Sequence, residues 1–238
     1  MHRFNILVIL LVTFFNMPGF SGTLPCFSEI RQFRPGQEDT INDNQNLYNG
    51  KIWSNLYYMI EGDQFLFSKD FLPGSLTING KTYADIYLKY DIFKDEILTP
   101  VDPGGILQLN KEMVDSFSLF FQNVTYRFIK LPEENVKGST KYFNILYKGK
   151  TALYLLHTKK IDKLSIEGNY DEFYQFSRIF FVKDSKSYQI SSKNDLIKVL
   201  IEDKDLIKKF IKRNKSDISV RVPESFIPVI RYYDSIIK

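Results

Sequence analysis

Residues 75–91 read Ser-Leu-Thr-Ile-Asn-Gly-Lys-Thr-Tyr-Ala-Asp-Ile-Tyr-Leu-Lys-Tyr-Asp, and this stretch is typical of a β-hairpin. Asn79-Gly80 is the strongest short hairpin signal, because both residues tolerate a positive φ. The returning strand alternates. One face would carry Ala84, Ile86, Leu88 and Tyr90, and the other Asp85, Tyr87, Lys89 and Asp91. This period of two predicts a sheet with one solvated face.

Similar strand-like patterns occur on both sides of this hairpin. Short apolar or alternating segments, separated by turn residues, lie at 93–98, 105–109, 116–121, 126–130, 142–147 and 151–157. A last hairpin is predicted at 179–190, and an earlier one at 51–68 that turns at Glu61-Gly62-Asp63-Gln64. About ten short strands in succession predict a mainly β (α+β) fold, an antiparallel meander that is curled or barrel-like to protect its edges.

The hydrophobic period changes from 2 to 3.6 after Ser191, which predicts helices. Leu196, Ile197, Leu200 and Ile201 would share one face of a helix capped by Ser192; Leu206, Ile207, Phe210 and Ile211 repeat the pattern. Pro223 fits the first turn of a third segment. We therefore expect an antiparallel β domain over 51–191 and a helical tail of two or three helices, packed on it, over 192–238.

The first residues predict a signal peptide over 1–21. A basic start at Arg3 precedes an apolar run from Phe4 to Phe15, shorter than the roughly 20 residues that cross a bilayer. Small residues at Gly19 and Ser21 favour cleavage after Ser21. An extended leader would follow over 22–50. We therefore expect an exported protein, in the periplasm, associated with the outer membrane or extracellular, without a transmembrane span in the mature chain.

Cys26 is the single cysteine of the chain. Lipidation at Cys26 is the alternative to a free thiol in the leader, but Pro25 directly before it disfavours the lipoprotein reading. One cysteine cannot form an internal disulfide. The core must therefore hold the fold even in an oxidising compartment.

The amino-acid composition indicates a folded domain and limits the classes of partner. Hydrophobic residues make up 44% of the chain and aromatics 16%, which is ample for a core. The net charge of +4 is mild and gives no nucleic-acid footprint.

A resemblance rests on Phe71-Leu72-Pro73-Gly74-Ser75 through Lys81, the Tyr90-Asp91 strand, and the helices that end in Phe226-Ile227-Pro228-Val229. Together these segments resemble uncharacterised exported β-rich proteins common in Bacteroidetes. The resemblance implies a bacterial cell-envelope setting. It implies no activity and no catalytic residue.

No catalytic, cofactor or metal residue can be assigned from the sequence. His157, the one histidine after the signal peptide, lies in an apolar strand and is more simply a half-buried strand residue than a general base. A Gly-x-Ser-x-Gly nucleophile motif, a zinc pattern and a phosphate-binding glycine loop are absent from the sequence. Four acids crowd one predicted turn, namely Asp91, Asp95, Glu96 and Asp102. These acids could be solvated residues at the end of a hairpin, or two of them could form the carboxylate pair of a hydrolase.

Two features could serve binding. The helical tail carries a basic face of Lys204, Lys208, Lys209, Lys212, Arg213 and Lys215, which could meet an anionic surface or could simply be solvated. The strands carry many tyrosines, among them Tyr57, Tyr83, Tyr87 and Tyr174, which suit a glycan or protein partner if exposed. The preferred hypothesis is a non-catalytic binding or structural protein of the envelope; the alternative is a carboxylate-dependent hydrolase of envelope polymers.

Overall fold

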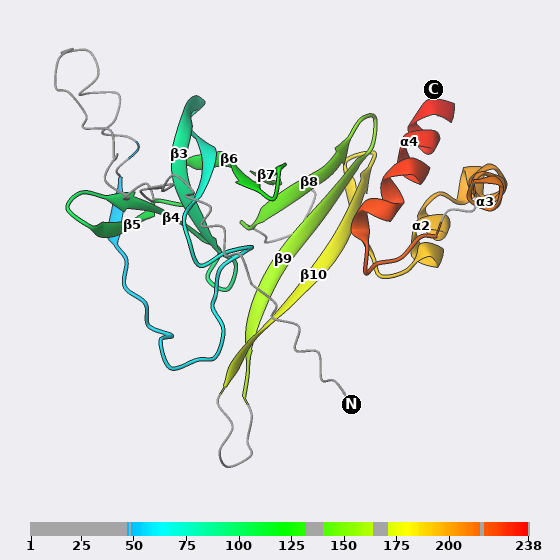
Figure 1. The fold of residues 1–238 in the computed structure, drawn as a ribbon. Helices are drawn as coiled ribbons and strands as arrows, with labels where there is room; N and C mark the ends of the chain where they lie inside the picture. The colour runs from blue at the N-terminus through cyan, green and yellow to red at the C-terminus, as the bar shows by residue number, and fades with distance from the viewer. Residues whose placement is uncertain (1–46, 48, 132–139, 164–170, 215–216, 238) are drawn as a thin grey trace, which may run out of the picture. The chain divides into compact units, whose positions relative to one another are not determined.

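The computed structural model describes residue 47 and residues 49–131, 140–163, 171–214 and 217–237. The predicted signal peptide, Cys26 and most of the predicted leader lie outside the described residues. Within the described part, the chain forms an antiparallel sheet followed by helices (Figure 1). The predicted mainly β fold is confirmed.

The described residues form an eleven-stranded sheet in the order β1-β5-β4-β3-β2-β6-β7-β8-β9-β10-β11. The strands are β1 (Gly50–Ile52), β2 (Leu72–Ile78), β3 (Lys81–Asp91), β4 (Glu96–Val101), β5 (Gly105–Leu109), β6 (Val114–Phe121), β7 (Val124–Lys130), β8 (Tyr142–Lys148), β9 (Ala152–Asp162), β10 (Glu172–Lys183) and β11 (Lys186–Ile190). The sheet is open, with β1 and β11 at its edges, so it does not close into a barrel.

The central hairpin joins β2 to β3 through the predicted turn. Asn79 and Gly80 both have positive φ, 48° and 78°, as this turn requires. Leu88 and Tyr90 are buried and Tyr87 is exposed, as the alternation predicts. Ala84 and Asp91 depart from it. Ala84 is exposed, and the Asp91 carboxylate, which was expected on the solvated face, is only 1% exposed.

The predicted hairpin over 51–68 is wrong. Only Gly50–Ile52 forms a strand there, and it pairs with β5 instead of with the following segment. The loop after it is held by Lys159 of β9, whose ammonium donates to the backbone oxygens of Asp63 and Phe65, each at 2.7 Å. These contacts join residues more than ninety positions apart, so no local pattern could reveal them.

The predicted last hairpin at 179–190 is confirmed as β10–β11, and the hairpin before it is longer than predicted. β9 and β10 pair continuously from Ala152–Val182 to Asp162–Glu172. The end of β9 (158–162) and the start of β10 (172–177) contain many polar residues, so a search for apolar segments did not predict them as strands. This extension places Lys159 where it can reach the loop before β2.

Helices α2 (Lys193–Val199), α3 (Lys204–Arg213) and α4 (Ile227–Ile236) follow the sheet and lie beside β9–β11 (Figure 1). Ser192 caps α2 as predicted, accepting from the Asp195 backbone N–H at 3.2 Å. Ile201 is 68% exposed instead of packed, because a 3₁₀ turn over Ile201–Asp203 breaks the helical period. Among the described residues, no helix is both long and apolar enough to cross a bilayer.

Three hydrophobic clusters hold the described fold, the smallest of them around Phe143, Tyr154 and Phe180. The first lies on β2–β7 and includes Leu88, Tyr90, Phe117 and Phe128. The second lies between β9–β11 and the helices, where Phe226, Ile230 and Tyr233 are fully buried. The helices therefore act as a cover for one end of the sheet.

Asp234 of α4 joins this cover to the turn between β8 and β9. Its carboxylate is 8% exposed. It accepts from the Thr151 hydroxyl at 2.6 Å, from the Thr151 backbone N–H at 3.1 Å and from the Tyr147 hydroxyl at 3.0 Å. A buried carboxylate with three donors is satisfied, and its removal leaves those donors without partners.

We predict that Asp234→Ala lowers the free energy of unfolding by about 2–4 kcal/mol, because buried donors lose a charged acceptor. Urea unfolding followed by circular dichroism measures the change. Ser235→Ala, an exposed neighbour on the same helix, is the control and should change stability by less than about 0.5 kcal/mol. Equal effects of both substitutions would contradict this role of Asp234.

Candidate functional site

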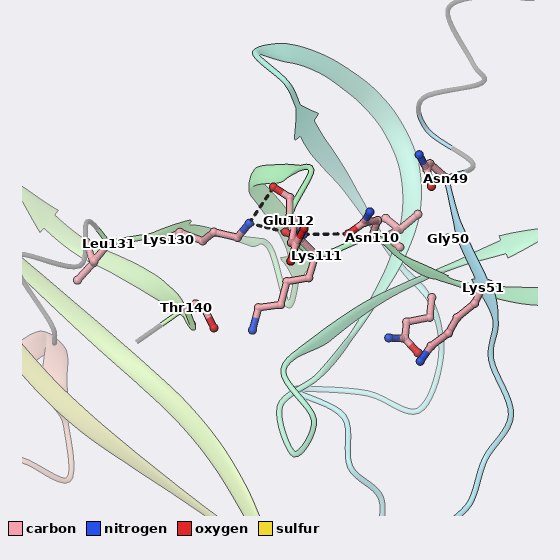
Figure 2. A pocket seen from close by; sticks show the side chains of 11 residues that line it. Asn49, Gly50, Lys51, Asn110, Lys111, Glu112, Lys130, Leu131 and Thr140 are labelled. Atoms are coloured by element: carbon pink, nitrogen blue, oxygen red, sulfur yellow. Dashed lines mark hydrogen bonds between the residues drawn. The ribbon is translucent and has the colours of Figure 1, made fainter. Parts of the chain in front are cut away.

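A pocket of about 790 Å³ lies beside the edge strand β1. Its polar lining includes Lys51, Lys111, Lys130, Asn49, Asn110 and Glu112. Leu109 and Leu131 add apolar walls. In Figure 2, Lys111 and Lys130 approach the pocket from one side and Lys51 from the other. We call it the lysine pocket.

Close packing of β1 on β5 builds one wall of the lysine pocket. Lys51 lies directly opposite Gln108 in the register of these strands. A Cβ atom at Gly50 would lie 2.1 Å from the Gln108 carbonyl oxygen, so only glycine permits this approach. The side chains of Lys51 and Gln108 therefore share one face of the sheet edge.

Asp95 fixes the position of Lys111. The Asp95 carboxylate is 4% exposed, forms an ion pair with the Lys111 ammonium, and accepts from the Tyr90 hydroxyl at 2.5 Å. The backbone N–H of Tyr142 lies 3.5 Å from the same carboxylate. These contacts tie the turn after β3 to the segment between β5 and β6 and to the start of β8.

Lys130 is a half-buried cation at the end of β7. Its ammonium donates to the Lys111 carbonyl oxygen and lies 3.5 Å from the Glu112 carbonyl oxygen. Burial, and then the Lys111 charge, lower the pKa of the Lys130 ammonium. Within the described part of the chain, no carboxylate lies within ion-pair distance of Lys130. An anion in the pocket would supply an ion-pair partner.

A second pocket of about 330 Å³ adjoins the first at the Lys51–Gln108 pair. Trp53 and Tyr57 line it from the loop after β1, Asp91 from the end of β3, and Glu96 from the start of β4. Lys51 and Gln108 belong to both pockets. We call the second pocket the acidic crevice.

Only one carboxylate oxygen of Asp91 accepts hydrogen bonds from the turn that follows β3. Oδ1 accepts from the backbone N–H groups of Phe93 at 2.9 Å and Lys94 at 2.8 Å. Oδ2 is buried and has no hydrogen-bond partner. Burial, opposed by these two hydrogen bonds and aided by the Glu96 charge, raises the pKa of Asp91 to about 6.

Asp91 and Glu96 are direct cross-strand partners in the antiparallel pairing of β3 and β4. Such partners point to the same face, with Cβ atoms about 4.5–5.5 Å apart. Two aromatic rings stand nearby. Trp53 packs against Phe65 at 5.9 Å between ring centroids, and Tyr57 packs edge-on against Phe93 at 5.1 Å.

The structure separates the four acids that the sequence analysis grouped. Asp91 and Glu96 meet in the acidic crevice. Asp95 lies behind the lysine pocket in its ion pair with Lys111. Asp102 is exposed in the turn between β4 and β5. Only one pair of the four therefore shares a concave site.

His157 lies on β9, as predicted. Its Nδ1 is 3.1 Å from the Ser177 hydroxyl, and its buried Nε2 has no partner. Burial lowers the pKa of His157 to about 4, so the ring is neutral at pH 7. The ring stands near Phe67 and Phe128, at 6.2 and 6.4 Å between centroids.

The other predicted binding features are dispersed. The lysines and Arg213 of α3 are exposed, while Ile207 on the opposite side is buried and Phe210 stacks on Tyr232 at 4.2 Å. Lys215 lies outside the described residues. Tyr87 and Tyr174 are exposed, at 57% and 59%. Tyr57 and Tyr83 are half-buried.

The described residues contain no group of three or more metal-type side chains placed to hold an ion. We compared the chain with protein family models, with curated proteins and with solved structures, and none of these comparisons gave a match. The candidate site therefore rests on its geometry alone.

Sequence reasoning missed the lysine pocket. Lys51, Lys111 and Lys130 come from three distant segments, and nothing in the local sequence distinguishes them from ordinary surface lysines. The one available signal was the Asn110-Lys111-Glu112 turn, which could not be told from any solvated turn. The pairing of β6 with β7 brings Lys130 to Lys111, and the pairing of β1 with β5, which was not predicted, adds Lys51.

We predict that Asp91→Asn stabilises the protein at pH 7.5 by up to about 3 kcal/mol, and that the gain vanishes below pH 4. The folded protein binds the Asp91 proton more tightly than the unfolded chain does, so the native state loses stability as pH rises from about 4 to about 6. Asparagine keeps the acceptor for the turn without the buried charge.

Urea unfolding of Asp91→Asn across this pH range measures the effect, with the exposed Asp102→Asn as the control. A variant less stable than the parent at pH 7.5 would show that the charged carboxylate is needed to hold the turn.

Proposed function

We propose that this chain is an exported, non-catalytic binding protein of the bacterial envelope, and that the lysine pocket receives an anionic group of its ligand. The observation that carries the proposal is the half-buried Lys130 ammonium. It faces the pocket without a carboxylate partner in the described part of the chain. A buried cation is costly unless an anion compensates it.

The surroundings of Lys130 favour an anion of modest size. Lys51 and Lys111 add positive charge, Asn49 and Asn110 add amide groups, and Asp95 offsets only Lys111. Glu112 is exposed at the border of the pocket. The charge balance is thus positive, and the volume admits a sugar unit or a similar small moiety.

The class of ligand follows from the expected setting. An exported protein of the envelope meets acidic polysaccharides, whose carboxylates are matched by ammonium and amide donors. The predicted signal peptide and the resemblance to exported proteins support this setting. The lysines of α3 are exposed to solvent. The lysine pocket is concave, so it can contact an anionic group from several sides and bind it more specifically.

We predict that Lys130→Gln weakens the binding of glucuronate, used as a probe of the lysine pocket, by about 10-fold or more. The substitution removes a charge-assisted hydrogen bond worth about 1.5–3 kcal/mol while keeping a side chain of similar length. Isothermal titration calorimetry on the mature chain measures the affinity, and binding should weaken as salt is added.

Lys186→Gln, at an exposed position of the edge strand β11, is the matched control and should leave the affinity unchanged. Absence of glucuronate binding by the parent, or equal losses in the two variants, would contradict the proposal. The helical lysines offer a further comparison, because Lys209→Gln should also have no effect.

A carboxylate-dependent hydrolase is the second candidate, and the pairing of Asp91 with Glu96 favours it. Two carboxyl groups on one face of a sheet, with one pKa raised, can act as acid and nucleophile or base toward a glycosidic bond.

The two functions differ in a simple assay. If the chain is only a binding protein, incubation with hyaluronan oligosaccharides should release no new reducing ends. Release that is abolished in Glu96→Gln and retained in Lys186→Gln would establish the hydrolase in its place.

A further inference from the structure

The lysine pocket and the acidic crevice are adjacent parts of one surface. Lys51 and Gln108 line both, and they are direct partners in the pairing of β1 with β5. A ligand longer than one sugar unit that enters the lysine pocket can therefore extend across this pair into the acidic crevice.

The acidic crevice differs from the lysine pocket in its chemistry. It brings together the carboxylates of Asp91 and Glu96, the ammonium groups of Lys51 and Lys94, and the amides of Gln64 and Gln108. Donors and acceptors are thus mixed and the formal charges balance. Such a lining matches hydroxyl groups, which both donate and accept, better than it matches an ion.

Aromatic rings form part of the same crevice. Trp53 and Tyr57 line it. Tyr57 is held from behind by edge contacts with Phe93 and Phe173, at 5.1 and 5.9 Å between centroids. Rings fixed in this way offer an apolar surface with a polar tip. A sugar presents both characters, a C–H face and a rim of hydroxyl groups.

The Asp91 carboxylate supplies an observation that points to a ligand. The residue is 1% exposed, yet its Oδ2 has no hydrogen-bond partner, while Oδ1 alone satisfies the turn. Asparagine could serve the turn equally well. A buried acceptor without a donor is costly, and a hydroxyl group of a ligand would complete it.

We propose that the acidic crevice is a subsite for an uncharged, hydroxyl-bearing sugar, which adjoins the lysine pocket. The ligand class is then an acidic polysaccharide in which charged and uncharged sugars alternate. Asp91 Oδ2 accepts from a sugar hydroxyl, Glu96 binds a second, and Trp53 contacts the face of the ring. This inference rests on the proposed function, since the charged sugar occupies the lysine pocket.

The test compares two probes on the mature chain by isothermal titration calorimetry. Glucuronate reaches only the lysine pocket. A hyaluronan tetrasaccharide, in which glucuronate alternates with an uncharged amino sugar, reaches both sites. We expect the parent to bind the tetrasaccharide at least about tenfold more tightly than glucuronate, since each added hydrogen bond of this kind contributes on that scale.

Asp91→Asn should weaken the tetrasaccharide about tenfold and leave glucuronate binding unchanged, because it replaces the unpaired acceptor by an amide. Glu96→Gln should act in the same direction. Asp102→Asn is the matched control. Thermal unfolding of each variant confirms that it is folded before its affinity is compared.

The outcomes separate the two proposals. Unchanged tetrasaccharide affinity in both Asp91→Asn and Glu96→Gln, with glucuronate still bound, overturns the subsite and leaves the lysine pocket standing. Loss of both probes in Asp91→Asn also overturns it, since the effect is then not confined to the crevice. If the parent protein binds neither glucuronate nor the tetrasaccharide, the proposed function itself is overturned.

Discussion

The buried carboxylate of Asp95 is the contact on which the lysine pocket depends. It joins the Lys111 ammonium, the Tyr90 hydroxyl and the start of β8 at one point. Its backbone has a φ of 61°, a left-handed conformation that aspartate tolerates better than most residues. The same residue therefore holds Lys111 at the lysine pocket and closes the turn that buries Asp91.

The two carboxylate oxygens of Asp91 differ in their hydrogen bonds, and only one of them contributes to the stability of the fold. Oδ1 satisfies the turn, and Oδ2 is left without a donor at a cost to the folded state. Natural chains keep such costs mainly at sites that bind or react, because selection retains what stability alone would remove. Lys130 is a second such case, because it is a half-buried cation with no carboxylate within ion-pair distance among the described residues.

Local sequence predicted the elements that local physics controls. The Asn79-Gly80 turn, the alternation of Leu88 and Tyr90, and the Ser192 cap all depend on residues close in sequence. The pairing of β1 with β5 and the hold of Lys159 on the loop before β2 depend on distant residues. Of the candidate site, the sequence therefore indicated only the crowding of acids near Asp91. The lysine pocket and the division between Asp91, Asp95 and Asp102 required the structure.

A crystal structure of the mature chain with the hyaluronan tetrasaccharide would show whether the two pockets bind neighbouring sugars. We expect a glucuronate carboxylate within hydrogen-bond distance of the Lys130 ammonium, and a hydroxyl of the neighbouring sugar within the same distance of Asp91 Oδ2. A tetrasaccharide bound along the exposed lysines of α3, with both pockets unoccupied, would contradict this expectation.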